Sequence, residues 1–107
     1  MKKYYLEVNE NPFFKGHSHL FQHLEFCCYF STYREVYDKV LSSLSSFFSG
    51  NEEEELLLKN EILHLVRLVM RNYREKSVSS LSFTYVVNGA ISDYRIICSF
   101  NKEQGNF

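Results

Sequence analysis

Proline and glycine are scarce in this chain of 107 residues, which contains one proline, four glycines and no tryptophan. This scarcity argues against intrinsic disorder, a flexible tether and a collagen-like repeat. With 45% hydrophobic residues, the chain is expected to form one domain over residues 1–107, with a polar tail at 101–107. Aromatic residues reach 17%, more than a core of this size needs, so part of the aromatic surface is expected to face a partner.

The chain also lacks an excess of positive charge, because it has twelve Lys and Arg residues and thirteen Asp and Glu residues. A net charge of −1 is not typical of nucleic-acid-binding domains, so no direct nucleic-acid partner is expected. The longest aromatic-aliphatic stretch, residues 20–30, contains Gln22, His23 and Glu25 and is too polar to span a bilayer. No apolar segment of a signal peptide follows the basic start. We therefore expect a cytoplasmic protein without membrane contact.

Cysteine is sparse, and the residues Cys27, Cys28 and Cys98 form an odd set in which two are adjacent. This pattern does not predict a disulfide framework. Each cysteine lies among aromatic or β-branched residues, so buried reduced thiols are expected rather than a nucleophile. The chain also has no Gly-x-Ser-x-Gly motif and no glycine-rich phosphate loop. The sequence therefore predicts neither an enzyme nor a cofactor.

Alternating apolar and polar residues predict a strand over residues 3–8, which Asn9 to Pro12 should end. A loop is expected from there to about His19. Residues 20–30 fit both a helix and a strand, and their aromatic content favours the strand. The buried face of that strand would consist of Leu20, Leu24, Phe26, Cys28 and Phe30.

Two helices are predicted between residues 32 and 74. Thr32 and Glu35 form a capping box at the start of the first helix, and Gly50 can end it in a left-handed conformation. Asn51 then begins the second helix, which should run to about Arg74. Apolar residues cover about half the circumference of this second helix, wider than a single core face requires. Leu57 and Leu68 lie outside even that arc.

Asn88-Gly89 lies between two alternating runs, residues 81–87 and 90–100, and is a strong signal for a type I′ hairpin turn. A two-residue turn would pair Val87 with Ala90 and Leu81 with Ile96. The element order is then strand, strand, helix, helix, strand, strand. This order predicts an α+β fold in which a mainly antiparallel sheet carries a helical hairpin on one face.

Four consecutive acidic residues, Glu52, Glu53, Glu54 and Glu55, allow two interpretations. They can complement the positive end of the helix dipole. They can also form an acidic patch that docks onto a basic protein surface, such as the nucleic-acid cleft of a nuclease, and accelerates association.

A histidine-rich stretch suggests an alternative of a different class. His17, His19 and His23 lie close in sequence to Glu25, Cys27 and Cys28, and the alternative is a small metal-dependent or RNase-like enzyme that uses the three histidines. Their spacing matches no standard zinc site. A solvated histidine loop without a metal is the favoured interpretation.

Assembly is predicted from the second helix. A two-fold axis crossing it would place Glu52 to Glu55 of one copy near Arg67, Arg71 and Arg74 of the other. Opposite charges would then flank an apolar centre that includes Leu57 and Leu68. The sequence therefore predicts a homodimer.

The general character of the chain resembles that of immunity proteins of bacterial polymorphic toxin systems. The shared features are small size, near-neutral charge, richness in Asn, Phe and Tyr, surplus aromatic residues and the lack of a catalytic motif. The resemblance implies a non-enzymatic cytosolic protein that binds and blocks a cognate toxin domain, often a nuclease. A phage-encoded inhibitor of a bacterial defence system would share this character.

Overall fold

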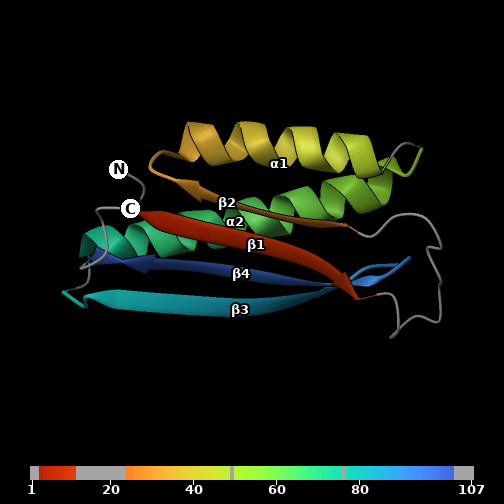
Figure 1. Cartoon of the computed structure of the whole chain (residues 1–107). Helices are drawn as coiled ribbons and strands as arrows, with labels where there is room; N and C mark the ends of the chain where they lie inside the picture. The colour runs from red at the N-terminus through yellow and green to blue at the C-terminus, as the bar shows by residue number, and fades with distance from the viewer. Residues whose placement is uncertain (1–2, 12–23, 49, 76, 103–107) are drawn as a thin grey trace.

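The computed structural model describes residues 3–11, 24–48, 50–75 and 77–102 (Figure 1). Its elements are β1 (Tyr4–Asn11), β2 (Glu25–Phe30), α1 (Tyr33–Phe47), α2 (Glu52–Glu75), β3 (Ser80–Asn88) and β4 (Asp93–Asn101). This order of strands and helices confirms the predicted α+β fold.

All four strands belong to one antiparallel sheet with the order β2-β1-β4-β3. The strands farthest apart in the chain, β1 and β4, are therefore neighbours at its centre, and β2 and β3 form its edges. Both helices cover the same face of the sheet (Figure 1). α1 contacts β2, whereas α2 contacts β4 and β3. The opposite face of the sheet is left open by the described elements.

The hydrophobic core lies between the sheet and the two helices. Side chains of the central strands, such as Leu6 and Ile96, are fully buried in the same core cluster as Val40 and Leu44 of α1. α2 contributes six buried apolar residues, namely Leu58, Ile62, Leu63, Leu65, Val66 and Val69. Because α2 packs against both the sheet and α1, most of its wide apolar arc is covered within the chain.

The predicted helix boundaries are confirmed by their local bonds. Thr32 Oγ1 accepts the Glu35 N–H at 3.3 Å, which caps the first turn of α1. Gly50 has a φ of +89°, a left-handed conformation that lets the chain turn between the helices. The carbonyl of Asn51 accepts the Glu55 N–H at 3.0 Å and so begins the bonding of α2.

The predicted end of the first strand at Val8 is wrong. β1 continues to Asn11, because β4 pairs with it over this stretch, with Glu10 opposite Tyr94. Pairing within the sheet thus outweighs the local turn signal of Asn9 to Asn11. Pro12, the predicted loop up to His19 and residues 20–23 lie outside the described residues. The strand predicted for residues 20–30 is confirmed over Glu25–Phe30.

The predicted hairpin register is also wrong. Val87 pairs with Tyr94 and Leu81 pairs with Phe100, so residues 89–92 form a longer connection than the type I′ turn. The displacement is an even number of residues, and in a strand an even shift keeps every side chain on its face. Tyr94 and Ile96 therefore face the core as predicted.

Burial of the cysteines is confirmed only in part. Cys98 is fully buried, and burial raises the pKa of its thiol to about 12. Cys28 is half-buried, whereas Cys27 is exposed. The expectation of three buried thiols fails at Cys27 because alternate residues of the edge strand β2 point to the open face of the sheet.

The orientation of α2 can be tested with two leucines that are two residues apart. Leu58 is 0% exposed and Leu56 is 52% exposed. We expect Leu58→Ala to lower the free energy of unfolding by about 3 kcal/mol, because it leaves a core cavity. Leu56→Ala should change it by less than about 1 kcal/mol. Urea unfolding at one protein concentration measures both, and equal losses would contradict this packing.

Candidate functional site

The connection between β3 and β4 is held by a side chain from α2. The carboxylate of Glu54 accepts the N–H of Ala90 at 2.9 Å and that of Ile91 at 3.0 Å. It also accepts the Ser92 N–H at 3.4 Å and the hydroxyl of Tyr94 at 2.8 Å. Glu54 is only 6% exposed. The connection is therefore wrapped around a buried carboxylate, which explains why it does not form a two-residue turn.

Gly89 permits this close approach. A Cβ atom at position 89 would collide with the carboxylate of Glu54 and with the carbonyl of Ser92. The Gly89 N–H donates to that same carbonyl at 2.9 Å. Glycine is needed here for space rather than for a positive φ, because Gly50 is the only described residue with φ above zero.

A second buried carboxylate lies on the other side of Ser92. Glu10 accepts the Ser92 hydroxyl at 2.6 Å and the Leu24 N–H at 3.3 Å. The Glu10 N–H in turn donates to the Leu24 carbonyl at 2.8 Å. Because Ser92 bonds both carboxylates, this network connects α2, the hairpin connection, the end of β1 and the residue before β2.

The electrostatics of this network keep Glu54 ionised at neutral pH. Burial alone would raise the pKa of Glu54, but the bonds from Ile91, Tyr94, Ala90 and Ser92 together lower it below its ordinary value of 4.5. The pKa of Tyr94 is raised, first by burial and then by the bond to Glu54. Tyr94 therefore remains a neutral donor.

The wrapped connection forms one wall of a surface hollow of about 470 Å³. Leu57, Ala90 and Ile91 supply its apolar lining, and Glu52 and Glu53 extend beside it. Glu52 and Glu53 are exposed, Glu55 is half-buried and Glu54 is internal. The four predicted partner-binding carboxylates therefore do not form one surface patch, because Glu54 lies in the protein interior. The sequence offered no signal for this, because the donors lie more than thirty residues further along the chain.

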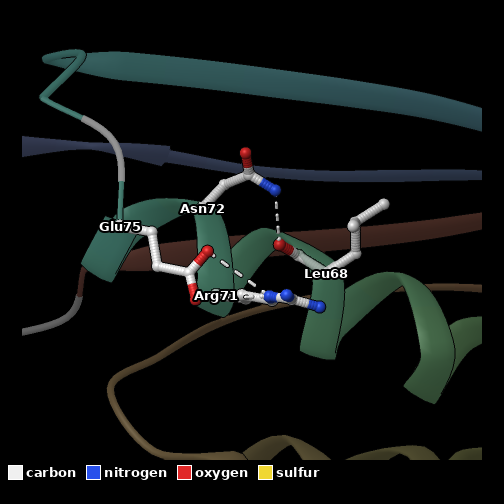
Figure 2. Close-up of polar contacts among 4 residues, drawn as sticks. All are labelled: Leu68, Arg71, Asn72 and Glu75. Carbon is white, nitrogen blue, oxygen red and sulfur yellow. Dashed lines mark hydrogen bonds and ion pairs between the residues drawn. The ribbon is translucent and has the colours of Figure 1, made fainter.

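Two of the three arginines predicted for a dimer interface, Arg67 and Arg71, have partners in their own chain. Arg67 donates to the Tyr33 hydroxyl at 2.7 Å and lies over its ring. Arg71 forms an ion pair with Glu75 at 3.3 Å, beside the bond from Asn72 to the Leu68 carbonyl (Figure 2). Arg74 is exposed. Cross-subunit charge pairing by Arg67 and Arg71 would therefore have to replace these bonds.

The two leucines of the predicted dimer interface are accessible. Leu57 and Leu68 are each 38% exposed. They are separated by three helical turns and so lie on one line along α2. The dimer itself stays a prediction.

The aromatic surplus lies partly on the open face of the sheet. Tyr29 is 53% exposed, and its ring lies 4.9 Å from that of Tyr5. The hydroxyl of Tyr5 donates to Glu7 at 2.6 Å, which lowers the pKa of Glu7. Most other rings among the described residues pack inward, as in the contacts of Tyr73 with Tyr4 and Phe100.

The metal hypothesis falls on residues that are not described. His17, His19 and His23 lie outside the described residues, and Glu25 and Cys27 are exposed on β2. Within the described ranges, no three His, Cys, Asp or Glu side chains come together to hold a metal ion.

Comparisons with protein-family models, curated proteins and solved structures found no match to this chain. In the described part of the chain, neither helix combines the length and apolarity needed to cross a bilayer. The functional argument therefore rests on the geometry of the surface hollow beside Glu52 and Glu53.

Replacing the buried carboxylate should destabilise the fold. In Glu54→Gln, the amide group would face backbone donors and leave at least one unsatisfied, at a cost of about 2–3 kcal/mol. The matched control is Glu53→Gln, since Glu53 is exposed and should change stability by less than about 0.5 kcal/mol. Chemical unfolding measures both variants, and equal stability of the two would contradict the bonding of Glu54.

The same variant predicts a pH dependence. A carboxylate with a lowered folded pKa contributes stability that is present above its unfolded pKa and is lost as pH falls through the folded pKa. The difference in unfolding free energy between the wild type and Glu54→Gln should thus be constant at neutral pH and shrink below 4.5. Unfolding curves from about pH 7 to about pH 3 test this. A difference that does not change over this range would refute a lowered pKa.

Proposed function

We propose that this chain is a non-enzymatic inhibitor that acts as an immunity protein and binds a cognate protein toxin domain. The observation that carries the proposal is the acidic hollow, defined as the surface lined by Asn51, Glu52, Glu53, Leu57, Ala90 and Ile91. It combines exposed carboxylates with an apolar lining.

The chemistry of the acidic hollow suits a basic protein surface. Protein interfaces commonly place apolar contacts at the centre and polar groups at the rim. Ala90 and Ile91 provide the apolar contacts, and Glu52 and Glu53 provide the acidic rim. A nuclease cleft that binds phosphate groups would present the complementary charge, so that long-range attraction accelerates its encounter with the acidic hollow.

The rigidity of the acidic hollow supports a role in tight binding. Ala90 and Ile91 are held by Glu54, which is itself fixed on a long helix. A surface that is already ordered loses less conformational entropy on association. The buried Glu54 therefore serves binding indirectly, because it positions the wall of the acidic hollow.

Co-expression gives the direct test of the proposed function. The product of the neighbouring reading frame is produced alone and together with this chain, and cell survival is counted. We expect toxicity that this chain relieves through a stoichiometric complex. A harmless neighbouring product that forms no complex would count against the immunity role. Stoichiometric zinc, or RNA cleavage that is lost in His19→Ala, would instead support the enzyme alternative.

Charge reversal at the rim tests the acidic hollow itself. Glu52→Lys with Glu53→Lys should slow association with the toxin domain and flatten its dependence on salt, because the attraction between unlike charges is lost. Glu54 is left intact, since its reversal would disrupt the fold. The matched control is Asp38→Lys with Glu75→Lys, which changes the net charge equally at exposed positions elsewhere. Equal association rates for the two double variants in stopped-flow mixing would exclude the acidic hollow as the docking surface.

A further inference from the structure

The edge strand β3 lacks the usual protection against pairing with another strand. It is nine residues long, and its sequence SLSFTYVVN contains no charged residue and no proline. Natural edge strands commonly avoid pairing with other molecules through charged residues, proline, bulges or short length. The other edge strand, β2, is six residues long and begins with Glu25.

The backbone bonds of the hairpin show which groups of β3 point outward. Gly89 donates to Ser92, and Lys102 donates to Ser79, at the two ends of the β3 to β4 ladder. Hydrogen-bonded pairs alternate along an antiparallel ladder, so the odd-numbered residues of β3 bond to β4. The N–H and C=O groups of Ser82, Thr84 and Val86 therefore point away from β4. Among the described strands, none lies beyond β3.

Side chains at this edge are unusually exposed. Val86 on the open face is 54% exposed, and Tyr85 on the helix side is 45% exposed. Tyr85 also lines a surface hollow of about 510 Å³ together with Glu61 and His64 of α2. The edge therefore offers both backbone groups and apolar side chains to one partner.

We propose that a second copy of this chain pairs with β3, antiparallel, about a two-fold axis at Thr84. Thr84 then lies opposite the partner's Thr84, and Ser82 opposite the partner's Val86. These even-numbered positions exchange the outward backbone bonds. On the helix side, Tyr85 lies opposite the partner's Phe83, an aromatic pair of the kind that stabilises neighbouring strands. The uncharged sequence of β3 brings no like charges together.

The same axis brings the two copies of α2 together. α2 contacts both β4 and β3, so its axis lies above the space between them. With strands about 4.8 Å apart, the two α2 helices would lie about 10 Å from one another. This separation is close to that of packed helices, about 8–10 Å. Strand pairing therefore produces a helix contact on the same side of the sheet.

The side chains that would meet between the helices are complementary. Leu57 and Leu68 lie on one line of α2, with Glu61 and His64 between them. In an antiparallel helix pair, Leu57 faces the partner's Leu68, and Glu61 faces the partner's His64. Apolar contacts then flank an imidazole and a carboxylate.

The two-fold axis of the β3 pair and that of the α2 pair lie at nearly the same position along the molecule. Gly89 lies against Glu54. From there, Thr84 is about 16 Å along β3. This distance corresponds to about 11 residues of α2, or the level of Leu65. The midpoint between Leu57 and Leu68 lies within one helical turn of Leu65. One two-fold axis can therefore pair β3 with β3 and α2 with α2 at the same time. This agreement favours a second copy of the chain, rather than an unrelated strand, as the partner of β3.

Sedimentation equilibrium tests the dimer. The wild type at micromolar concentration should show twice the chain mass of 12.7 kDa. Thr84→Lys should return it to 12.7 kDa, because two lysines would lie opposite one another at the axis. The matched control is Cys27→Lys, since Cys27 lies in the same cross-strand row at the opposite edge. It should remain a dimer, with circular dichroism confirming the fold of each variant.

Cysteine cross-linking tests the register in a Cys27→Ser background. Thr84→Cys should form a disulfide-linked dimer, because paired Cα atoms in this ladder lie about 5.5 Å apart. Ser82→Cys alone should not, whereas Ser82→Cys with Val86→Cys should. A monomeric wild type, or a dimer that survives Thr84→Lys and is lost in Cys27→Lys, would overturn the proposal. The proposed function is tested separately, because its variants lie at the acidic rim, Glu52 and Glu53, and its readout is toxin neutralisation.

Discussion

The carboxylate of Glu54 organises the part of the molecule that we propose as the binding surface. It lies inside the protein and accepts bonds from three consecutive backbone N–H groups of the hairpin connection and from Tyr94. Without it, these partly buried donors would lose their common acceptor, at a substantial cost in folding free energy. The carboxylate thus determines the length of the connection, the pairing of β3 with β4 and the shape of the acidic hollow.

Local sequence signals were sufficient where the interactions are local. The Thr32 capping box, the left-handed Gly50 and the alternation that places Tyr94 in the core all depend on neighbours along the chain, and each is confirmed. These local signals were insufficient where a group distant in the sequence binds the same backbone. Asn88-Gly89 signals a tight turn, but Glu54 binds the next three N–H groups, and Gly89 gives the carboxylate room. Likewise, nothing in the run of four glutamates distinguished Glu54, whose hydrogen-bond donors lie in the β3 to β4 connection and in β4.

The wide apolar arc of α2 illustrates a different limit. Its width led to the prediction of a dimer interface, but α1 covers part of the arc in addition to the sheet. Only Leu56, Leu57 and Leu68 remain exposed among its large apolar residues. The sequence of a helix shows how much apolar surface must be buried. The arrangement of the other elements determines whether the same chain buries it.

The sheet order also has a consequence for how the protein is made. The two central strands, β1 and β4, are the first and last described strands, and Tyr4 pairs with Phe100. On a ribosome, β1 must wait until β4 has been synthesised before the centre of the sheet can close. During that interval β1 and β2 can pair only with each other, and the inner edge of β1 stays open. Long-range pairing of this kind slows folding, so the nascent chain depends on remaining shielded until its last strand arrives.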